Sequence, residues 1–322
     1  MSKTRTKIAI LGATSHIACG LISRLLADAR FELSLFGRST ARIHHFLGDI
    51  GASGAALVSD RFSALNDQPH DVVINCVGAG TPSQLGGDLS AWFTITEEFD
   101  NLALSHLRQV NPDAMLIAFS SGAVYGLAAQ PPFDDDSRLS LAVNCLSKPD
   151  FYTIARLHAE AKHRAMTRLR IADLRIFAYY SRFMSAGAGY FMSDVLRSLL
   201  TGTPLLTHGD DMTRDYIAPD DLFQLVLRCL DTPDINGAFD ACSAAPVSKS
   251  AILKCFGDVF GLRWTIADRE ASPNGDKNIY YSRSQRATTA LGYRPTMTAL
   301  EGLVLETRAR LQKAYRHGNT SP

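Results

Sequence analysis

Near the N-terminus the chain reads Lys7-Ile8-Ala9-Ile10-Leu11-Gly12-Ala13-Thr14-Ser15-His16-Ile17-Ala18. An apolar strand runs here into a tight turn of small residues, and the helical pattern Leu21-Ile22-Arg24-Leu25-Leu26 follows. A mononucleotide-binding βαβ unit begins in this way, because small residues let the backbone turn sharply and a free helix N-terminus attracts a pyrophosphate. A plain strand-to-helix turn is the alternative, since only Gly12 is a glycine, and Ser15 and Ala18 stand where a full fingerprint has two more. The residues expected to contact a dinucleotide are Gly12, Thr14, Ser15, His16 and Ile17.

Length and composition are those of a globular enzyme. The 322 residues carry a formal net charge of +1, so no overall field attracts nucleic acid or an anionic membrane. The N-terminal residues are polar, and no run of about twenty apolar residues occurs, which predicts a soluble, cytoplasmic protein. The six cysteines form no C-x-x-C pair, and the acidic run Asp134-Asp135-Asp136 has no histidine at ligand spacing. We therefore expect free thiols and no metal site.

Short β-rich runs alternate with amphipathic helical runs, which predicts a parallel sheet with helices on both faces. The predicted strands are 8–11, 31–36, 71–77, 114–120, 171–178 and 238–241, and the predicted helices are 20–28, 91–110, 152–169 and 219–230. Glycines and prolines interrupt the second half, as in a lobe that wraps over a sheet edge. The prediction is an α/β protein with a doubly wound parallel sheet and a smaller, discontinuous lobe. The sheet unit comprises 1–178 and about 215–245, and the lobe about 179–214 and 246–322.

The second predicted strand ends in Leu35-Phe36-Gly37-Arg38-Ser39, where an NAD-selective protein usually carries a carboxylate for the ribose hydroxyls. The charge here is positive. Arg38 and Ser39 could pair with a 2′-phosphate, so these residue types favour NADP over NAD, with a solvated arginine as an equal alternative. Farther on, a buried strand breaks into the small residues Cys76-Val77-Gly78, and a flat cofactor could pass close to this backbone at Val77.

Two segments carry residues for proton chemistry. Ser120-Ser121-Gly122 follows a predicted central strand, at the edge where open α/β sheets bind ligands. Tyr152, Arg156 and Glu160 share one face of a predicted helix at i, i+4 and i+8. A guanidinium one turn from a phenol stabilises its phenolate, so Tyr152 is a candidate acid or base. An ordinary salt-bridged helix surface is the alternative.

Together these residues resemble the extended short-chain dehydrogenase/reductase family, in its nucleotide-sugar epimerase/dehydratase branch. The turn from Gly12 to Ala18 resembles the family's G-x-x-G-x-x-G/A, and 120–126 resembles its S-S-x-x-V-Y-G strand end. Residues 152–160 resemble Y-x-x-x-K followed four residues later by glutamate. Three later segments, 174–181, 214–222 and 290–295, resemble L-R-x-x-N-x-Y-G, R-D-Y-I-x-V-x-D-L and L-G-Y/W-x-P.

The resemblance implies a Rossmann sheet and hydride transfer at a carbon of a nucleotide sugar, with NAD or NADP as cofactor. In that setting Tyr152 would be the acid/base, Ser121 would hold the sugar oxygen and Arg156 would hold the nicotinamide ribose. Arg214 would bind the nucleotide diphosphate, because a bidentate guanidinium suits phosphate oxygens.

The resemblance also places substrate residues in the lobe and implies an assembly. Arg182 and Phe191 would lie in the part of the lobe that encloses the sugar. The helix that carries Tyr152 often pairs across a two-fold axis in this family, so a homodimer is expected.

Several departures from the family pattern bear on activity. Arg156 stands where the family has lysine, and arginine is bulkier and permanently charged. Ala178 replaces an asparagine, and Ser181-Arg182 replaces Gly-Pro. Gly122-Ala123 stands where the 4,6-dehydratases of the family have Asp-Glu, so a dehydratase is disfavoured.

Three functional hypotheses follow from these residues. A 4-keto reductase that takes NADPH is the first choice because of Arg38. A nucleotide-sugar 4-epimerase, which keeps NAD tightly bound and returns the hydride that it removed, is the alternative. The third hypothesis, motivated by Arg156, is a dinucleotide-binding sensor or scaffold without turnover.

Overall fold

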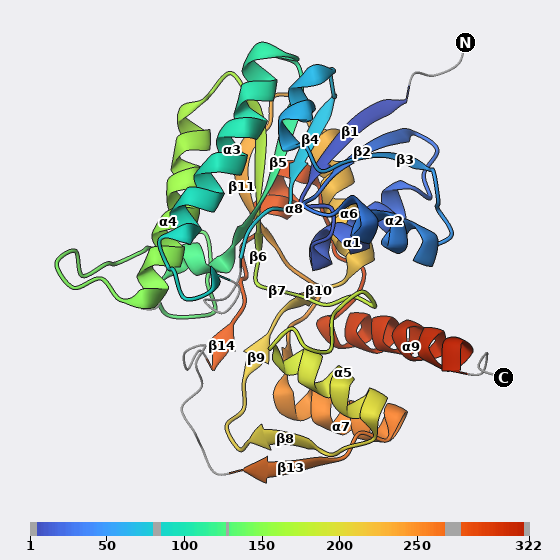
Figure 1. The fold of residues 1–322 in the computed structure, drawn as a ribbon. Coiled ribbons are helices and arrows are strands. Elements are labelled where there is room, and N and C mark those ends of the chain that lie inside the picture. Colours follow the sequence, from blue (N-terminus) through green and yellow to red (C-terminus); the bar gives the residue numbers. More distant parts are fainter. Residues whose placement is uncertain (1–4, 80–84, 127–128, 268–277, 319–322) are drawn as a thin grey trace.

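A seven-stranded parallel sheet forms the centre of the computed structural model, which describes residues 5–79, 85–126, 129–267 and 278–318 (Figure 1). The strands are β1 (Thr6–Leu11), β2 (Phe31–Phe36), β3 (Ala56–Ser59), β4 (Val72–Asn75), β5 (Met115–Ser121), β6 (Arg170–Ile176) and β11 (Asn236–Ala241). Their order is β11-β6-β5-β4-β1-β2-β3, and every neighbouring pair is parallel. The order reverses between β1 and β4, and such a switch point is where open α/β sheets bind ligands.

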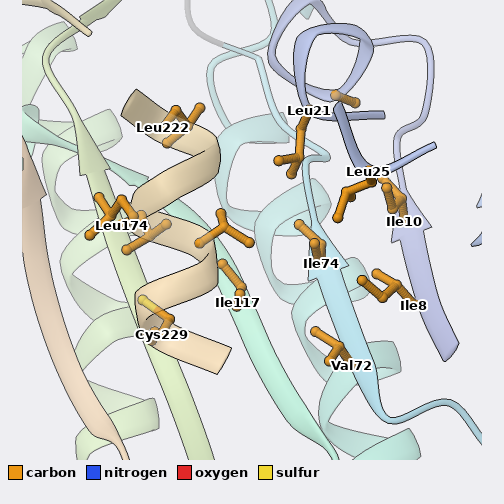
Figure 2. Close-up of a cluster of buried hydrophobic side chains, with 14 of the residues drawn as sticks. Ile8, Ile10, Leu21, Leu25, Val72, Ile74, Ile117, Leu174, Leu222 and Cys229 are labelled. Atoms are coloured by element: carbon orange, nitrogen blue, oxygen red, sulfur yellow. The ribbon is translucent and has the colours of Figure 1, made fainter. Parts of the chain in front are cut away.

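Helices cover both faces of the sheet, so the predicted doubly wound fold is confirmed. One face carries α1 (His16–Leu25), α2 (Thr40–Asp49), α6 (Pro219–Leu230) and α8 (Arg286–Leu291), and the other carries α3 (Ala91–Gln109) and α4 (Lys148–Ala165). Figure 2 shows leucines of α1 and α6 packed over the side chains of the central strands, among them Ile8, Ile10, Val72, Ile74, Ile117 and Leu174. The alternate strand residues Ala9, Leu11, Val73 and Leu116 are buried on the opposite face with α3. These strands are apolar throughout because both faces of a parallel sheet are covered.

A second, smaller core lies beyond the carboxyl ends of the strands (Figure 1). It is built by α5 (Phe191–Thr201), α7 (Lys249–Phe260) and part of α9 (Ala299–Gly318), beside the paired strands β8 (Leu205–His208) and β13 (Trp264–Ala267). Short strands join this lobe to the sheet unit. β7 (Ala178–Tyr179) pairs with β10 (Tyr216–Ile217), and β9 (Thr213–Arg214) lies between β12 (Val247–Ser248) and β14 (Ile279–Tyr280).

The division into a sheet unit and a lobe stays a proposal, and the packing of one segment bears on its boundaries. The segment 246–322 was expected to build lobe, yet Ala287, Leu291 and Tyr293 in and after α8 pack into the core beneath the sheet. We therefore propose a two-part division in which 286–293 belongs to the sheet unit. Among the described helices, none is both long and apolar enough to cross a membrane.

Candidate active site

The turn between β1 and α1 lets a ligand approach the backbone closely. Gly12 has a φ of +75°, and a Cβ there would lie 3.0 Å from the backbone of Cys76 and 3.1 Å from Val77 Cγ2, so glycine is required. Ser15 Oγ accepts the N–H three residues on, at 3.3 Å, and caps α1. The N–H of Val77 donates to Asn75 Oδ1 at 3.0 Å and shapes the facing strand end. The first turn of α1 therefore opens at the switch point, which fits a pyrophosphate.

His16, predicted to contact the cofactor, is turned toward the segment that follows β7. Its Nε2 accepts the N–H of Ser181 at 3.1 Å, and its ring lies edge-on to Tyr179 at 4.9 Å. Burial lowers the pKa of His16 to about 4, so the ring is neutral and carries its proton on Nδ1. Only that Nδ1–H is left to donate to a phosphate. Thr14 and Ile17 are half-buried beside it, and Ile17 packs against the sheet core.

The predicted ribose edge carries an exposed cation. Arg38 is exposed, and in the described ranges it has neither an ion pair nor a hydrogen bond. Ser39 Oγ accepts the N–H of Arg42 at 3.3 Å and caps α2, so this hydroxyl already has a structural role. Arg38 therefore remains available to a 2′-phosphate.

Ser121, Tyr152 and Arg156 gather at the carboxyl ends of β4 and β5. Ser121 ends β5, and its Oγ accepts the N–H of Ala123 at 3.1 Å at the start of the 3-10 helix η3 (Gly122–Tyr125). Tyr152 lies half-buried in α4, with its ring 5.3 Å from that of Trp92. The Arg156 guanidinium carbon lies 5.3 Å from the centre of the Tyr152 ring. The permanent positive charge of Arg156 thus forms a cation–π contact with the Tyr152 ring.

The bulk of Arg156 is accommodated by a glycine in the segment that follows β4. The arginine is 9% exposed, and its Nη1 donates to Phe119 O of β5 at 3.4 Å. A Cβ at Gly78 would lie 2.3 Å from Arg156 Nη2. Gly78 is therefore the residue that leaves room for the larger cation.

This contact predicts that Gly78→Ala lowers kcat by about tenfold, because the buried guanidinium must leave its place against Tyr152. In an Arg156→Lys background the same change should lower kcat by about twofold at most, since lysine has no guanidinium group to displace. The kcat values of the four proteins, with NAD affinity measured alongside, test this coupling. Equal losses in both backgrounds would show that Gly78 matters for a reason unrelated to Arg156.

Tyr280 is a site residue that the sequence reasoning missed. It enters from β14, its Oη lies 3.5 Å from Ser121 Oγ, and its ring contacts Phe177 with centroids 5.1 Å apart. The Arg214 guanidinium lies 5.9 Å from the centre of this ring and donates to Thr213 O at 3.0 Å. Tyr280 thereby links Arg214, predicted for the diphosphate, to Ser121. No local pattern marks it, because it lies 159 residues from its partner.

The two predicted lobe residues lie apart from this group. Arg182 is held by Glu306 of α9, to which its Nη2 donates at 2.7 Å and its Nε at 3.0 Å. Phe191 begins α5, is half-buried and packs against the lobe core. Substrate contact by either residue stays a prediction.

A network of buried charges underlies the site. Glu160, on the same helix face as Tyr152, accepts from Ser120 Oγ at 2.6 Å and from Arg175 Nη2 at 2.6 Å. Arg175 Nη1 also donates to Tyr125 Oη at 3.0 Å. The ends of β5 and β6 are thus cross-linked to α4. No cluster of side chains suited to a metal ion occurs in the described ranges.

A sheet with a phosphate-type turn at its switch point, and a hydroxyl, a phenol and a cation at adjacent strand ends, defines a dinucleotide-binding α/β protein. The model of the NAD dependent epimerase/dehydratase family matches residues 8–242. The chain belongs to this family, as the sequence resemblance indicates.

Similar proteins agree with this assignment. UDP-glucuronate 4-epimerase 3 of Arabidopsis thaliana is 24% identical over 225 residues, which cover 64% of this chain and 50% of the relative. UDP-glucuronate 4-epimerase 1 of the same plant is 22% identical over 218 residues, or 61% of this chain and 48% of the relative. The chain thus spans about half the length of these curated relatives.

Solved structures share the whole fold. A UDP-glucuronic acid 4-epimerase from Bacillus cereus, in complex with UDP-glucuronic acid and NAD, has a TM-score of 0.77 at 20% identity, covering 95% of this chain and 99% of that chain. A UDP-glucose-4-epimerase from Stenotrophomonas maltophila with bound NAD has a TM-score of 0.80 at 16% identity, covering 97% of this chain and 100% of that chain. At these sequence identities the similarity shows that the fold is shared, and it shows no more than the fold.

Proposed function

We propose that the protein is a nucleotide-sugar 4-epimerase that retains NAD. The observation that carries the proposal is the convergence of the Ser121 hydroxyl, the Tyr152 phenol and the Arg156 cation at the switch edge of the sheet. The relatives named above are 4-epimerases, and the two solved structures contain NAD. They favour the epimerase over the 4-keto reductase that Arg38 suggests as the first choice.

The residues of the candidate site would have separate roles in such a reaction. The turn at Gly12 and the first turn of α1 would hold the cofactor pyrophosphate, and Arg156 would hold the nicotinamide ribose. The bound NAD would supply reversible hydride transfer at C4 of the sugar. Tyr152 Oη, as the phenolate, would take the proton of the C4 hydroxyl and later give it back from the phenol, while Ser121 Oγ would hydrogen-bond the same oxygen. Arg214 pairs with the diphosphate.

Arg38 favours a second candidate function, an NADPH-dependent 4-keto reductase. An exposed guanidinium after β2 suits a 2′-phosphate, and a cofactor that exchanges as NADPH suits a 4-keto reductase. Preference for NADP therefore rests on this one side chain.

The test begins with the nucleotide that copurifies with the protein. Retained NAD, together with interconversion of UDP-glucuronate or UDP-glucose and its 4-epimer without added cofactor, would support the epimerase. A larger rise in melting temperature with NADPH than with NADH, and oxidation of NADPH by a nucleotide 4-keto sugar, would support the reductase. Binding of neither dinucleotide would contradict both activities.

Arg156 separates these activities from a sensor or scaffold. If the wild type binds a dinucleotide but transfers no hydride, and Arg156→Lys gains turnover, the non-catalytic hypothesis is supported. A working enzyme should instead lose rate in Arg156→Lys, because lysine lacks the guanidinium contact to Phe119 O.

We also propose a cytoplasmic homodimer that binds neither nucleic acid nor membrane. The surface between α3 and α4 is a groove of about 270 Å³ lined in part by Phe93, Ile154 and His158, and the helix that carries Tyr152 forms one wall. Light scattering after gel filtration would show the expected mass of two chains.

A further inference from the structure

The segment that enters the lobe, residues 179–182, is fastened on two sides. On the side of the turn between β1 and α1, the N–H of Ser181 donates to His16 Nε2 at 3.1 Å. Toward the C-terminal helix α9, Tyr180 Oη and Thr307 Oγ1 lie 2.9 Å apart, and both side chains are buried. We call residues 179–182 the joint, because they connect α1, α9 and the lobe.

A fully buried carboxylate closes the joint. Glu306 of α9 is 0% exposed and accepts the backbone N–H of Arg182 at 2.7 Å in addition to two bonds from its guanidinium. Arg24 of α1 lies 3.3 Å away through Nη2. Burial alone would raise the pKa of Glu306, but the hydrogen bonds from Arg182 outweigh it and lower the pKa. Glu306 is therefore a charged group that both cations face.

The two arginines depend on Glu306 unequally. Arg24 Nε also lies 2.6 Å from Asp220 Oδ1, and its Nη1 donates to Gly20 O at 3.2 Å, so α1 keeps partners without Glu306. Across the described ranges, the Arg182 guanidinium has Glu306 as its sole hydrogen-bond partner, and Asp220 acts on it only through its charge at longer range. Loss of Glu306 should therefore loosen the lobe side of the joint more than the cofactor side.

We propose that Glu306 is a positioning residue, which holds the joint so that the lobe presents the nucleotide sugar to Ser121 and Tyr152. The structure assigns Arg182, which stands with Ser181 in place of the family's Gly-Pro, to this anchor. The inference rests on the proposed substrate class. It differs from a direct role in substrate binding, because two of the three guanidinium nitrogens already donate to one carboxylate.

Glu306→Gln tests the proposal, since it keeps the size of the side chain and removes its charge. With UDP as the probe, we expect the Kd for UDP to rise about tenfold and the Kd for NAD to stay within about twofold. Arg182→Gln should reproduce this split, and Arg308→Gln, an exposed change on the same helix, should leave both values unchanged. Unchanged UDP binding in Glu306→Gln would overturn the proposal, because it would mean that Glu306 does not position the lobe for the ligand. Tighter UDP binding would also overturn it, because it would mean that Arg182 was freed to bind the ligand.

Hydrogen exchange without ligand separates this inference from the proposed function. Amides of residues 179–184 should exchange about fivefold or more faster in Glu306→Gln than in wild type, while those of α1 stay protected. If wild type binds no UDP, the proposed function fails, but faster exchange confined to the joint still supports the anchor. Unchanged exchange at the joint, or equally faster exchange throughout the chain, would overturn it.

Discussion

Tyr152→Phe is expected to abolish turnover and to leave NAD binding intact. The change removes one phenolic oxygen, while the ring keeps its contacts with Trp92 and the Arg156 guanidinium. Without that oxygen no group in the cluster can take the proton of the sugar hydroxyl, and Ser121 is too weak a base at neutral pH to replace it. We expect kcat to fall by roughly a thousandfold, which is the usual scale of general acid–base catalysis.

Steady-state kinetics and NAD titration of the same preparation check this expectation. Tyr281→Phe is the matched control, because this phenol accepts from Arg283 Nη2 at 3.3 Å and, among the described residues, makes no hydrogen bond to Ser121, Tyr152 or Arg156. The control should keep kcat within about twofold of wild type. A Tyr152→Phe enzyme with near-normal kcat would remove Tyr152 from the mechanism, and lost NAD binding would show a structural role instead.

His163→Ala should cause the largest loss of stability among the histidines. His163 is 0% exposed, with Nε2 2.6 Å from Asp100 Oδ1 and Nδ1 2.9 Å from Asp173 Oδ1. Since carboxylates face both nitrogens, both must carry protons. Removal of the imidazolium breaks two buried hydrogen bonds to charged groups and leaves Asp100 paired with Lys162 alone and Asp173 with Arg164 alone. For the two lost bonds we expect a loss of roughly 3–5 kcal/mol in the free energy of unfolding. Urea denaturation measures it, and exposed His44→Ala should cost no more than about 0.5 kcal/mol.

The effect of His163 should also depend on pH. Burial opposes its charged form, but the hydrogen bonds to Asp100 and Asp173 outweigh burial and raise its pKa from 6.5 to about 9. The stabilisation by the imidazolium is therefore complete below pH 6.5, declines as pH rises and is lost above about pH 9. The difference in stability between wild type and His163→Ala should narrow over this interval. A difference that is small or independent of pH would contradict a charged His163.

Local sequence patterns were sufficient to predict most helices and strands of the sheet unit. The predicted strand 31–36 and helix 219–230 match β2 and α6 residue for residue, and 91–110 exceeds α3 by one residue. The predicted helix 152–169 is displaced from α4 by four residues, because Ser147 and Asp150 form a capping box that starts the helix earlier. The short edge strand β3 was missed, since its four residues carry no strong alternation and are only partly buried.

Spacing along one element likewise predicted part of the candidate site. Tyr152 and Arg156 are one helical turn apart, so their contact follows from α4 alone. Gly12 follows β1 directly, and its need for a positive φ comes from the local turn. Ser121 lies at the end of β5, and parallel strands place such ends along one edge of the sheet.

The sequence by itself thus determined the fold class, because periodicities within single βαβ units predict it. The family followed from the resemblance of six motifs, and the candidate residues at the switch edge from their places at strand ends and on one helix face. Only the tertiary structure decided which distant groups pair with them. Arg182 meets Glu306 across 124 residues, and Ser121 meets Tyr280 across 159. The spacing of residues within one helix or strand does not predict contacts between residues so far apart in the sequence. Burial is costly for an unpartnered charge, so a side chain such as Arg182 takes the partner that the packed segments bring to it, and that packing exists only in the folded chain.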